Sequence, residues 1–204
     1  MKALTGNENF WFDGMPLGFL LCDFWAWSSS DLLKGTLRGA LAEFIVATAI
    51  GVDTSEAHED LYPYDLTMPC SGMDDCKIEV KSSAYVNSGA HVGPSEISFR
   101  CGRSRRTERG KEVLPAEEAR RASDVYVFCL QFCRDRAEVD PLNLDQWLFY
   151  VLPTATFEDK CPNRKTISLP GLHKLRAALV DYGNLRPAIE AAYMASKQAG
   201  EAAQ

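Results

Sequence analysis

The sequence lacks an excess of positive charge, a membrane-spanning apolar run and any regular spacing of cysteines. Among its 204 residues, 22 Lys and Arg stand against 28 Asp and Glu, which gives a net charge of −6. This balance excludes a protein whose whole surface binds nucleic acid or membrane, although it leaves room for a local basic patch. The apolar stretch 15–27 is interrupted by Asp23, is too short to span a bilayer and lacks the basic leader of a signal peptide. We therefore expect a soluble, cytoplasmic protein with no membrane partner.

The seven cysteines are odd in number, and no two of them have the C-x2-C spacing of a zinc site. In a reducing cytoplasm most of these thiols are expected to be small buried hydrophobes. Cys129 and Cys133 lie in an apolar run and are expected on one face of a strand. The three histidines, His58, His91 and His173, form neither an H-x-H nor an H-E-x-x-H pattern, which argues against a zinc hydrolase.

The chain does contain an ordered series of helix and strand patterns. They predict the α/β class, with a mixed central sheet flanked by helices, in one domain over residues 1–204. A helix is expected over 32–50, with residues 28–31 as N-cap candidates and Gly51 as its stop. The aromatic N-terminal extension, 1–31, is expected to pack its part 10–27 on the core as an irregular or hairpin-like cover. Further strands are expected over 61–68, 76–85, 96–101, 125–133, 147–152 and 167–169, and helices over 115–122, 171–181 and 184–197.

The expected strand 76–85 carries the sequence Ile78-Glu79-Val80-Lys81. Side chains alternate along a strand, so Glu79 and Lys81 share one face while Ile78 and Val80 enter the core. Asp65 lies at the end of the preceding strand pattern and converges on Glu79 if the two strands pair. Two adjacent carboxylates repel each other unless a cation lies between them, and oxygen ligands suit Mg²⁺ or Mn²⁺. The alternative interpretation is a solvated strand face on which Lys81 pairs with any nearby acid.

One acidic residue, Glu43, interrupts the apolar pattern of the expected helix 32–50. Burying a lone carboxylate costs several kcal/mol unless another group compensates its charge. An arginine such as Arg38 is the structural candidate for that role. A metal ion, or the lysine on the sheet beneath the helix, is the functional candidate.

Together, Glu43, Asp65 and Glu79-Val80-Lys81 make the chain resemble the PD-(D/E)XK nuclease superfamily, with its restriction-endonuclease-like fold. The resemblance covers about residues 32–152 and implies an αβββαβ core. The chain departs from the name-giving motif because Tyr64-Asp65 replaces Pro-Asp, with a proline one place earlier. The rival acids Asp74 and Asp75 are interpreted as turn residues, since Asp is favoured there for local backbone hydrogen bonds.

The resemblance implies a Mg²⁺-dependent deoxyribonuclease, an endonuclease of the restriction-like kind, with Mn²⁺ as a substitute ion. Asp65, Glu79 and the carbonyl of Val80 would bind the metal, and Glu43 would reach it through a water or support a second ion. Lys81 would position the attacking water or help to deprotonate it, and would stabilise negative charge. The alternative is a non-catalytic nucleic-acid-binding or scaffold protein that retains the fold.

A nuclease of net charge −6 needs a local basic surface for its partner, DNA. The loop-like segment 103–111 is the candidate, with a solvated flexible loop as the alternative interpretation. Cutting both strands of a duplex would favour a symmetric homodimer. The candidate nucleic-acid contacts are Ser82, Ser83, Arg100, Arg103, Arg105, Arg106 and Arg109.

Overall fold

The computed structural model describes residues 2–57, 62–72, 74–89, 93–105 and 113–201. The N-terminal part contains the strands β1 (Asn9–Phe12) and β2 (Met15–Leu20) and the helices α1 (Leu21–Ser29) and α2 (Gly35–Ile50). The strands that follow are β3 (Leu66–Met68), β4 (Cys76–Ala84), β5 (Ser98–Arg100), β6 (Val125–Gln131) and β7 (Trp147–Pro153). The C-terminal part contains α3 (Thr154–Lys160), β8 (Thr166–Ser168), α4 (Leu169–Lys174), β9 (Ala178–Val180) and α5 (Leu185–Glu201). Within these described ranges, no helix is long and apolar enough to cross a membrane.

The central sheet has five strands in the order β3-β4-β6-β7-β9. It is mixed, as predicted, because β4 and β6 run parallel while the other neighbours are antiparallel. The expected strand 96–101 forms as β5, but it pairs with β8 in a separate two-stranded sheet. The third strand of the expected αβββαβ core is therefore outside the central sheet.

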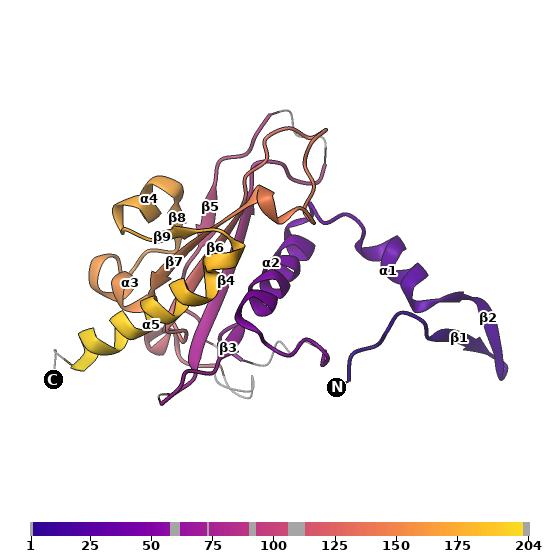
Figure 1. Cartoon of the computed structure of the whole chain (residues 1–204), viewed down its shortest axis with the longest axis horizontal. Coiled ribbons are helices and arrows are strands. Elements are labelled where there is room, and N and C mark those ends of the chain that lie inside the picture. The colour runs from indigo at the N-terminus through magenta and orange to yellow at the C-terminus, as the bar shows by residue number, and fades with distance from the viewer. Residues whose placement is uncertain (1, 58–61, 73, 90–92, 106–112, 202–204) are drawn as a thin grey trace.

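Two apolar layers cover the sheet (Figure 1). On one face, α2 and α5 pack on the residues of β4, β6 and β7 that point toward them, with Val46, Val127 and Phe149 fully buried. On the other face lie the β5–β8 pair, α3 and α4, with Phe99, Phe128 and Phe157 at the centre of the layer. Helices therefore flank the sheet on both faces, but the second face is also covered by strands.

The strand patterns of the sequence explain the positions in the sheet. In β4, Ile78 and Val80 are buried in the α2–α5 layer, while Glu79 and Lys81 are only half-buried on the opposite face. All seven residues of β6 are buried, because both faces of this central strand are covered. Helix α2 ends at Gly51, whose φ of 76° is the left-handed conformation that favours glycine at a helix end.

Several expectations about helices and caps were wrong. The expected helix 115–122 is only a 3-10 turn, Ala116–Glu118, and the expected helix 171–181 stops at Lys174 before strand β9. Leu172, Leu175 and Leu179 have the i, i+3, i+7 spacing of a helix face, but residues 178–180 satisfy their backbone by pairing with β7. Helix α3 was missed because it has only seven residues, and these show no amphipathic pattern. Residues 28–31 do not cap α2, which begins after Lys34 without a side-chain cap.

The N-terminal extension is a hairpin, as predicted, but its predicted packing on the core was wrong. It forms an arm (residues 4–30) in which β1, β2 and α1 project away from the body (residues 31–201 as described), as Figure 1 shows. The hairpin turns at Asp13-Gly14, where both residues have positive φ, as a two-residue hairpin turn requires. Its aromatic side chains remain exposed, up to 85% for Trp27, so the arm does not cover the core. Aromatic content predicts contact with an apolar surface, and this body does not supply that surface.

Candidate active site

Asp65 lies directly before β3, at the edge of the central sheet. Its N–H donates a hydrogen bond to the carbonyl of Ile78, 3.0 Å away, which extends the β3–β4 pairing by one residue. This pairing places Asp65 opposite Glu79, on the same face of the sheet. The carboxylate oxygen Oδ2 of Asp65 accepts a hydrogen bond from the backbone N–H of Val80 at 2.7 Å. The backbone of β4 therefore fixes the carboxylate beside the E-x-K sequence.

The ammonium of Lys81 lies among three oxygen atoms. Its Nζ is 2.6 Å from Oε1 of Glu79, 2.9 Å from the carbonyl oxygen of Val80 and 3.4 Å from Oδ2 of Asp65. We call these four residues the acid–lysine cluster. The side chains of Asp65, Glu79 and Lys81 are 23%, 19% and 27% exposed, so solvent reaches the cluster from one side. Three of the predicted metal donors thus converge on one positive charge.

The electrostatics of the cluster keep Lys81 charged. Burial by itself would lower the pKa of Lys81, but the carboxylates of Glu79 and Asp65 outweigh it and raise that pKa above its ordinary value. Tyr126, the partner of Glu79 in the β4–β6 register, has its pKa raised by burial first and by the charge of Glu79 second. At neutral pH the cluster therefore contains a protonated lysine beside a neutral phenol.

Glu43 comes from α2, in the helical layer, and lines a cavity together with Asp65 at the edge where β3 begins. This cavity has a volume of about 510 Å³. Its walls also include Tyr62 and Tyr64, whose rings stack with centroids 5.4 Å apart. Tyr62 is 38% exposed and was missed as a site residue, although its place in Tyr62-Pro63-Tyr64-Asp65 was the available signal.

The rival acids lie outside the contacts of this cluster. Asp74 and Asp75 are exposed in the segment before β4, and the carbonyl of Asp74 accepts a hydrogen bond from the hydroxyl of Tyr193 on α5. Within the described residues, no three His, Cys, Asp or Glu side chains are arranged to hold a metal ion. The donor set of the cluster is instead two carboxylates and one backbone carbonyl.

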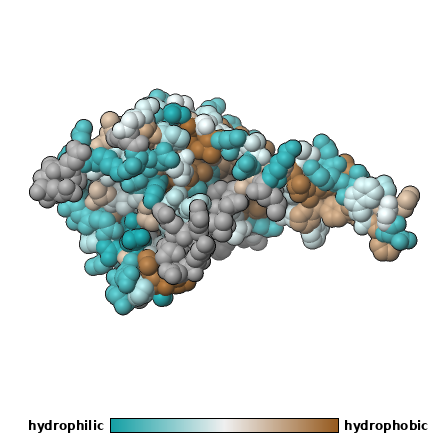
Figure 2. Space-filling model, turned by 90° about the horizontal axis from the view of Figure 1, so that it is seen from below, coloured by the Kyte–Doolittle hydropathy of each residue, from teal (hydrophilic) through white to brown (hydrophobic). Residues whose placement is uncertain are grey.

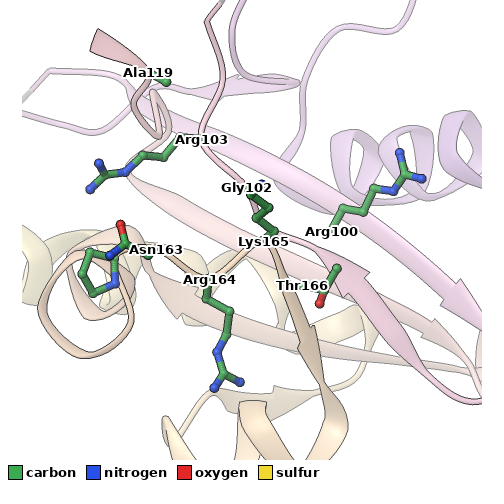
Figure 3. A pocket seen from close by; sticks show the side chains of 9 residues that line it. Arg100, Gly102, Arg103, Ala119, Asn163, Arg164, Lys165 and Thr166 are labelled. Atoms are coloured by element: carbon green, nitrogen blue, oxygen red, sulfur yellow. The ribbon is translucent and has the colours of Figure 1, made fainter. Parts of the chain in front are cut away.

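A second site, the basic pocket, has a volume of about 590 Å³ and lies between β5 and the segment before β8. Figure 3 shows the side chains that line it. Among the described residues, the side chains of Arg100, Arg164 and Lys165 make no hydrogen bond or ion pair, and Arg103 pairs with Glu158. Within the described part of the chain, the lining contains no carboxylate; it consists of Arg100, Gly102, Arg103, Ala119, Pro162, Asn163, Arg164, Lys165 and Thr166.

A buried arginine holds this pocket in shape. The side chain of Arg121 is fully buried, and its guanidinium donates hydrogen bonds to the carbonyls of Cys101, Pro162 and Arg164. It also pairs with Glu158 at 2.8 Å. One cation thus ties together the two chain segments that carry the exposed arginines, so that the pocket is ordered without a ligand.

The basic pocket and the acid–lysine cluster lie on the same side of the sheet. Lys81 is paired in register with Phe128, and these neighbours point to the same face. The ring of Phe128 packs against that of Phe99 in β5, with centroids 5.2 Å apart. Arg100, the residue after Phe99, lines the pocket.

The other predicted nucleic-acid contacts are scattered. Arg105 is exposed and donates to the carbonyl of Leu114, Ser82 is half-buried, and Ser83 is only 8% exposed. Arg106 and Arg109 lie outside the described residues. Arg164 and Lys165 were missed by the sequence analysis, because they lie far along the chain from the arginine-rich segment 100–109; their signal is the run Pro162-Asn163-Arg164-Lys165 beside a short strand.

The cysteines and Arg38 serve the fold. Cys76, Cys101 and Cys129 are buried free thiols, but Cys22 is exposed and Cys133 lies beyond β6, so that Cys129 and Cys133 do not share a strand face. Burial raises the pKa of the Cys101 thiol.

Arg38 is buried and donates hydrogen bonds to the carbonyl of Leu33 and the side chain of Asn87.

Comparison of the chain with known protein families, with curated proteins and with solved structures found no match in any of the three. The resemblance to the PD-(D/E)XK superfamily therefore stays a prediction. Its support is the contact geometry of Asp65, Glu79, Val80 and Lys81 given above.

Proposed function

We propose that the protein is a metal-dependent deoxyribonuclease that hydrolyses phosphodiester bonds within DNA. The observation that carries this proposal is the convergence of Asp65, Glu79 and the carbonyl of Val80 on one cation, the ammonium of Lys81. A solvated strand face would also let Lys81 pair with one nearby acid, but it gives no reason for a second carboxylate and a main-chain carbonyl to contact the same ammonium. Here a strand pairing, a backbone hydrogen bond and a paired lysine hold these groups within reach of one another.

The donor set fits Mg²⁺. This ion prefers oxygen ligands and is bound in proteins by one or two carboxylates together with waters and substrate phosphates. Asp65, Glu79 and the carbonyl of Val80 would hold it, with Glu43 facing the same cavity as Asp65. Once bound, Mg²⁺ supplies charge that polarises a phosphate and acidifies water. Mn²⁺, with the same preference for oxygen, is the expected substitute.

The ammonium of Lys81 would act as a hydrogen-bond donor and as a positive charge in the reaction. Beside the carboxylates of Glu79 and Asp65, its raised pKa keeps it protonated, and it donates hydrogen bonds to them. We assign it the positioning of the attacking water, or help in its deprotonation, and the stabilisation of the negative charge that develops on the phosphate.

The surroundings of the cluster support a polyanionic substrate. On the same side of the central sheet, the basic pocket offers cations that have no partner among the described residues and that suit phosphate groups. The stacked pair Tyr62 and Tyr64 lies beside Asp65, and aromatic rings of this kind stack with unpaired bases. DNA is therefore expected to cross the cluster with its backbone directed toward the pocket.

The test is cleavage of plasmid and linear DNA by the pure protein with Mg²⁺, with Mn²⁺ and with a chelator. Asp65→Asn and Lys81→Ala should each lose cutting, whereas Asp75→Asn is the matched control, since Asp75 is an exposed acid on the same chain segment. We expect the control to cut like wild type. Failure of wild type to cut, with DNA binding that is the same with and without metal, would instead identify a non-catalytic nucleic-acid-binding or scaffold protein.

A further inference from the structure

The arm exposes more large apolar side chains than any comparable length of the body. Figure 2 shows the apolar surface that runs along it. Trp27 is 85% exposed, Phe12 74% and Trp11 65%. The complete set is Leu4, Phe10, Trp11, Phe12, Met15, Phe19, Phe24, Trp25 and Trp27. At about 200 Å² for each such side chain, the exposed part is about 1,000 Å² for each arm.

The internal contacts of the arm are too few to maintain its fold in water. A single two-stranded hairpin is marginally stable in water, and so is a helix as short as α1. Every residue of α1 is at least partly exposed. The internal packing includes Phe10 against Phe19, with ring centroids 5.0 Å apart, and Trp25 against Gly6. A surface outside the arm is needed to keep these elements folded.

The arm is held to the body at both ends. The N–H of Ala3 donates to the carbonyl of Ser55 at 3.2 Å, and the backbones of Lys2 and Glu56 form an isolated antiparallel β-bridge. At the other end, the hydroxyl of Ser88 donates to Asp31. The arm is therefore anchored to the body at both of its ends. Its exposure is not explained by a chain end that hangs free.

The charge of the arm restricts what covers it. Residues 4–30 contain three acids, Glu8, Asp13 and Asp23, and no Lys or Arg. Nucleic acids and anionic lipid surfaces attract basic segments and repel acidic ones. The arm thus fits a protein surface.

Its shape favours a second copy of the chain. Neighbouring side chains of a strand point to opposite faces, so Trp11 and Phe12 place large apolar groups on both sides of the hairpin. Around a two-fold axis, each arm would pack against the other arm on one face and against the partner's body on the other. The body carries exposed apolar side chains that could receive it, including Phe44 and Met194. Two arms would bury about 2,000 Å² of their own surface, at the upper end of the standard range for a specific interface.

We propose that the arm is a dimerisation element that packs on a second copy of this chain. The proposal is independent of the nuclease function. Sedimentation velocity of the full chain from about 1 to 100 µM should give a dimer. The double variant Trp11→Ser/Trp27→Ser should raise the dimer dissociation constant at least about 30-fold, the effect of one interface hot spot. Leu142→Ser is the matched control, since Leu142 is as exposed as Trp11 but lies on the body; it should remain a dimer.

Tryptophan fluorescence gives a second measurement on the unaltered protein. Three of the four tryptophans are in the arm, and the fourth, Trp147, is 2% exposed. Dimer formation should therefore reduce acrylamide quenching and shift the emission to the blue as concentration rises. A monomer at 100 µM, an arm variant that still dimerises like wild type, or tryptophans quenched as strongly in the dimer as in the monomer would overturn the proposal.

Discussion

The acid–lysine cluster and the basic pocket lie on the same side of the central sheet. They differ in whether their cations have oxygen partners. In the cluster, the single ammonium of Lys81 has oxygen partners at 2.6 and 2.9 Å. In the pocket, Arg100, Arg164 and Lys165 have no side-chain partner among the described residues, and the one neighbouring carboxylate, Glu158, pairs with Arg103 and the buried Arg121.

This difference indicates that the cluster is suited to bind a cation and the pocket to bind an anion. A cluster in which acids surround a cation is organised to hold positive charge, and an ion can take the place of that cation. A pocket of unpaired cations on a rigid frame is organised to hold negative charge, because binding an anion there costs no internal ion pair. Together the two sites suit a substrate that is bound through one phosphate and attacked at another.

Substitution of Lys81 by alanine should have the largest effect and sharpens the comparison. We expect DNA cleavage to fall about 100- to 1,000-fold, the range for loss of a group that stabilises transition-state charge. Mn²⁺ affinity, measured by calorimetry, should rise, because the ammonium no longer competes for Asp65 and Glu79. Lower Mn²⁺ affinity in this variant would mean that the lysine supports the ion and does not stand in its place.

Asp65→Asn, which serves in the cleavage test, should lose Mn²⁺ binding and become slightly less stable. The loss of stability is expected because Asp65 pairs with Lys81.

Arg121→Met should have the next largest effect, and it tests whether the pocket is rigid. The change leaves three carbonyls without their guanidinium donor, and the free energy of unfolding should fall by about 3 kcal/mol. Arg103→Met is the control, since Arg103 pairs with the same Glu158 from an exposed position and should cost less than about 1 kcal/mol. Urea unfolding measures both. Equal losses in the two variants would argue against a special role for the buried arginine.

Arg164→Gln combined with Lys165→Gln tests the anion-binding side of the comparison. We expect DNA affinity at low salt to fall about tenfold, and the slope of log K against log salt to decrease by about 2, because two phosphate contacts are lost. Lys174→Gln removes an exposed cation of α4 outside the pocket lining and should leave both quantities unchanged. Fluorescence anisotropy at several salt concentrations provides the measurement. An unchanged slope in the double variant would remove the pocket from the DNA path.

The smallest expected effect concerns pH. Burial tends to raise the pKa of Glu158, but hydrogen bonds from Arg103 and Arg121 outweigh it and leave that pKa below its ordinary value. A carboxyl with a lowered pKa in the folded state contributes stability above its unfolded pKa and loses it as pH falls through the folded one. Glu158→Gln should therefore cost less than about 1 kcal/mol at pH 7, and the cost should shrink as pH falls through the folded pKa of Glu158. Thermal unfolding at pH 7 and below measures the difference; a cost that is constant with pH would point to packing.

The parts of the fold that the sequence predicted are those in which one side-chain period dominates. The alternation around Ile78 and Val80 identified β4, and the apolar runs 125–133 and 147–152 identified the central strands β6 and β7 to within two residues. Failure came where a neighbour decides the structure. Strand β9 exists because β7 offers an edge, β5 pairs with β8 across the chain, and the aromatic arm leaves the body instead of covering its core.

The candidate site shows the same division. Asp65, Glu79 and Lys81 could be placed because alternation in β4 and the antiparallel partner before it put them on one face. The basic pocket could not, since Arg164 and Lys165 reach Arg100 only through the β5–β8 pairing, which joins segments more than 60 residues apart. The register of a long-range pairing is invisible in a local pattern.

The lysine in the acid–lysine cluster also bears on how this chain becomes a folded protein in a cell. Many metal sites leave their carboxylates or thiolates repelling one another until the ion arrives, so that folding depends on the supply of metal. Here Lys81 is part of the polypeptide itself, so the negative charge of the carboxylates is countered before any metal ion binds. The amount of native protein should then be indifferent to the free divalent-ion concentration, and only its activity should follow that concentration.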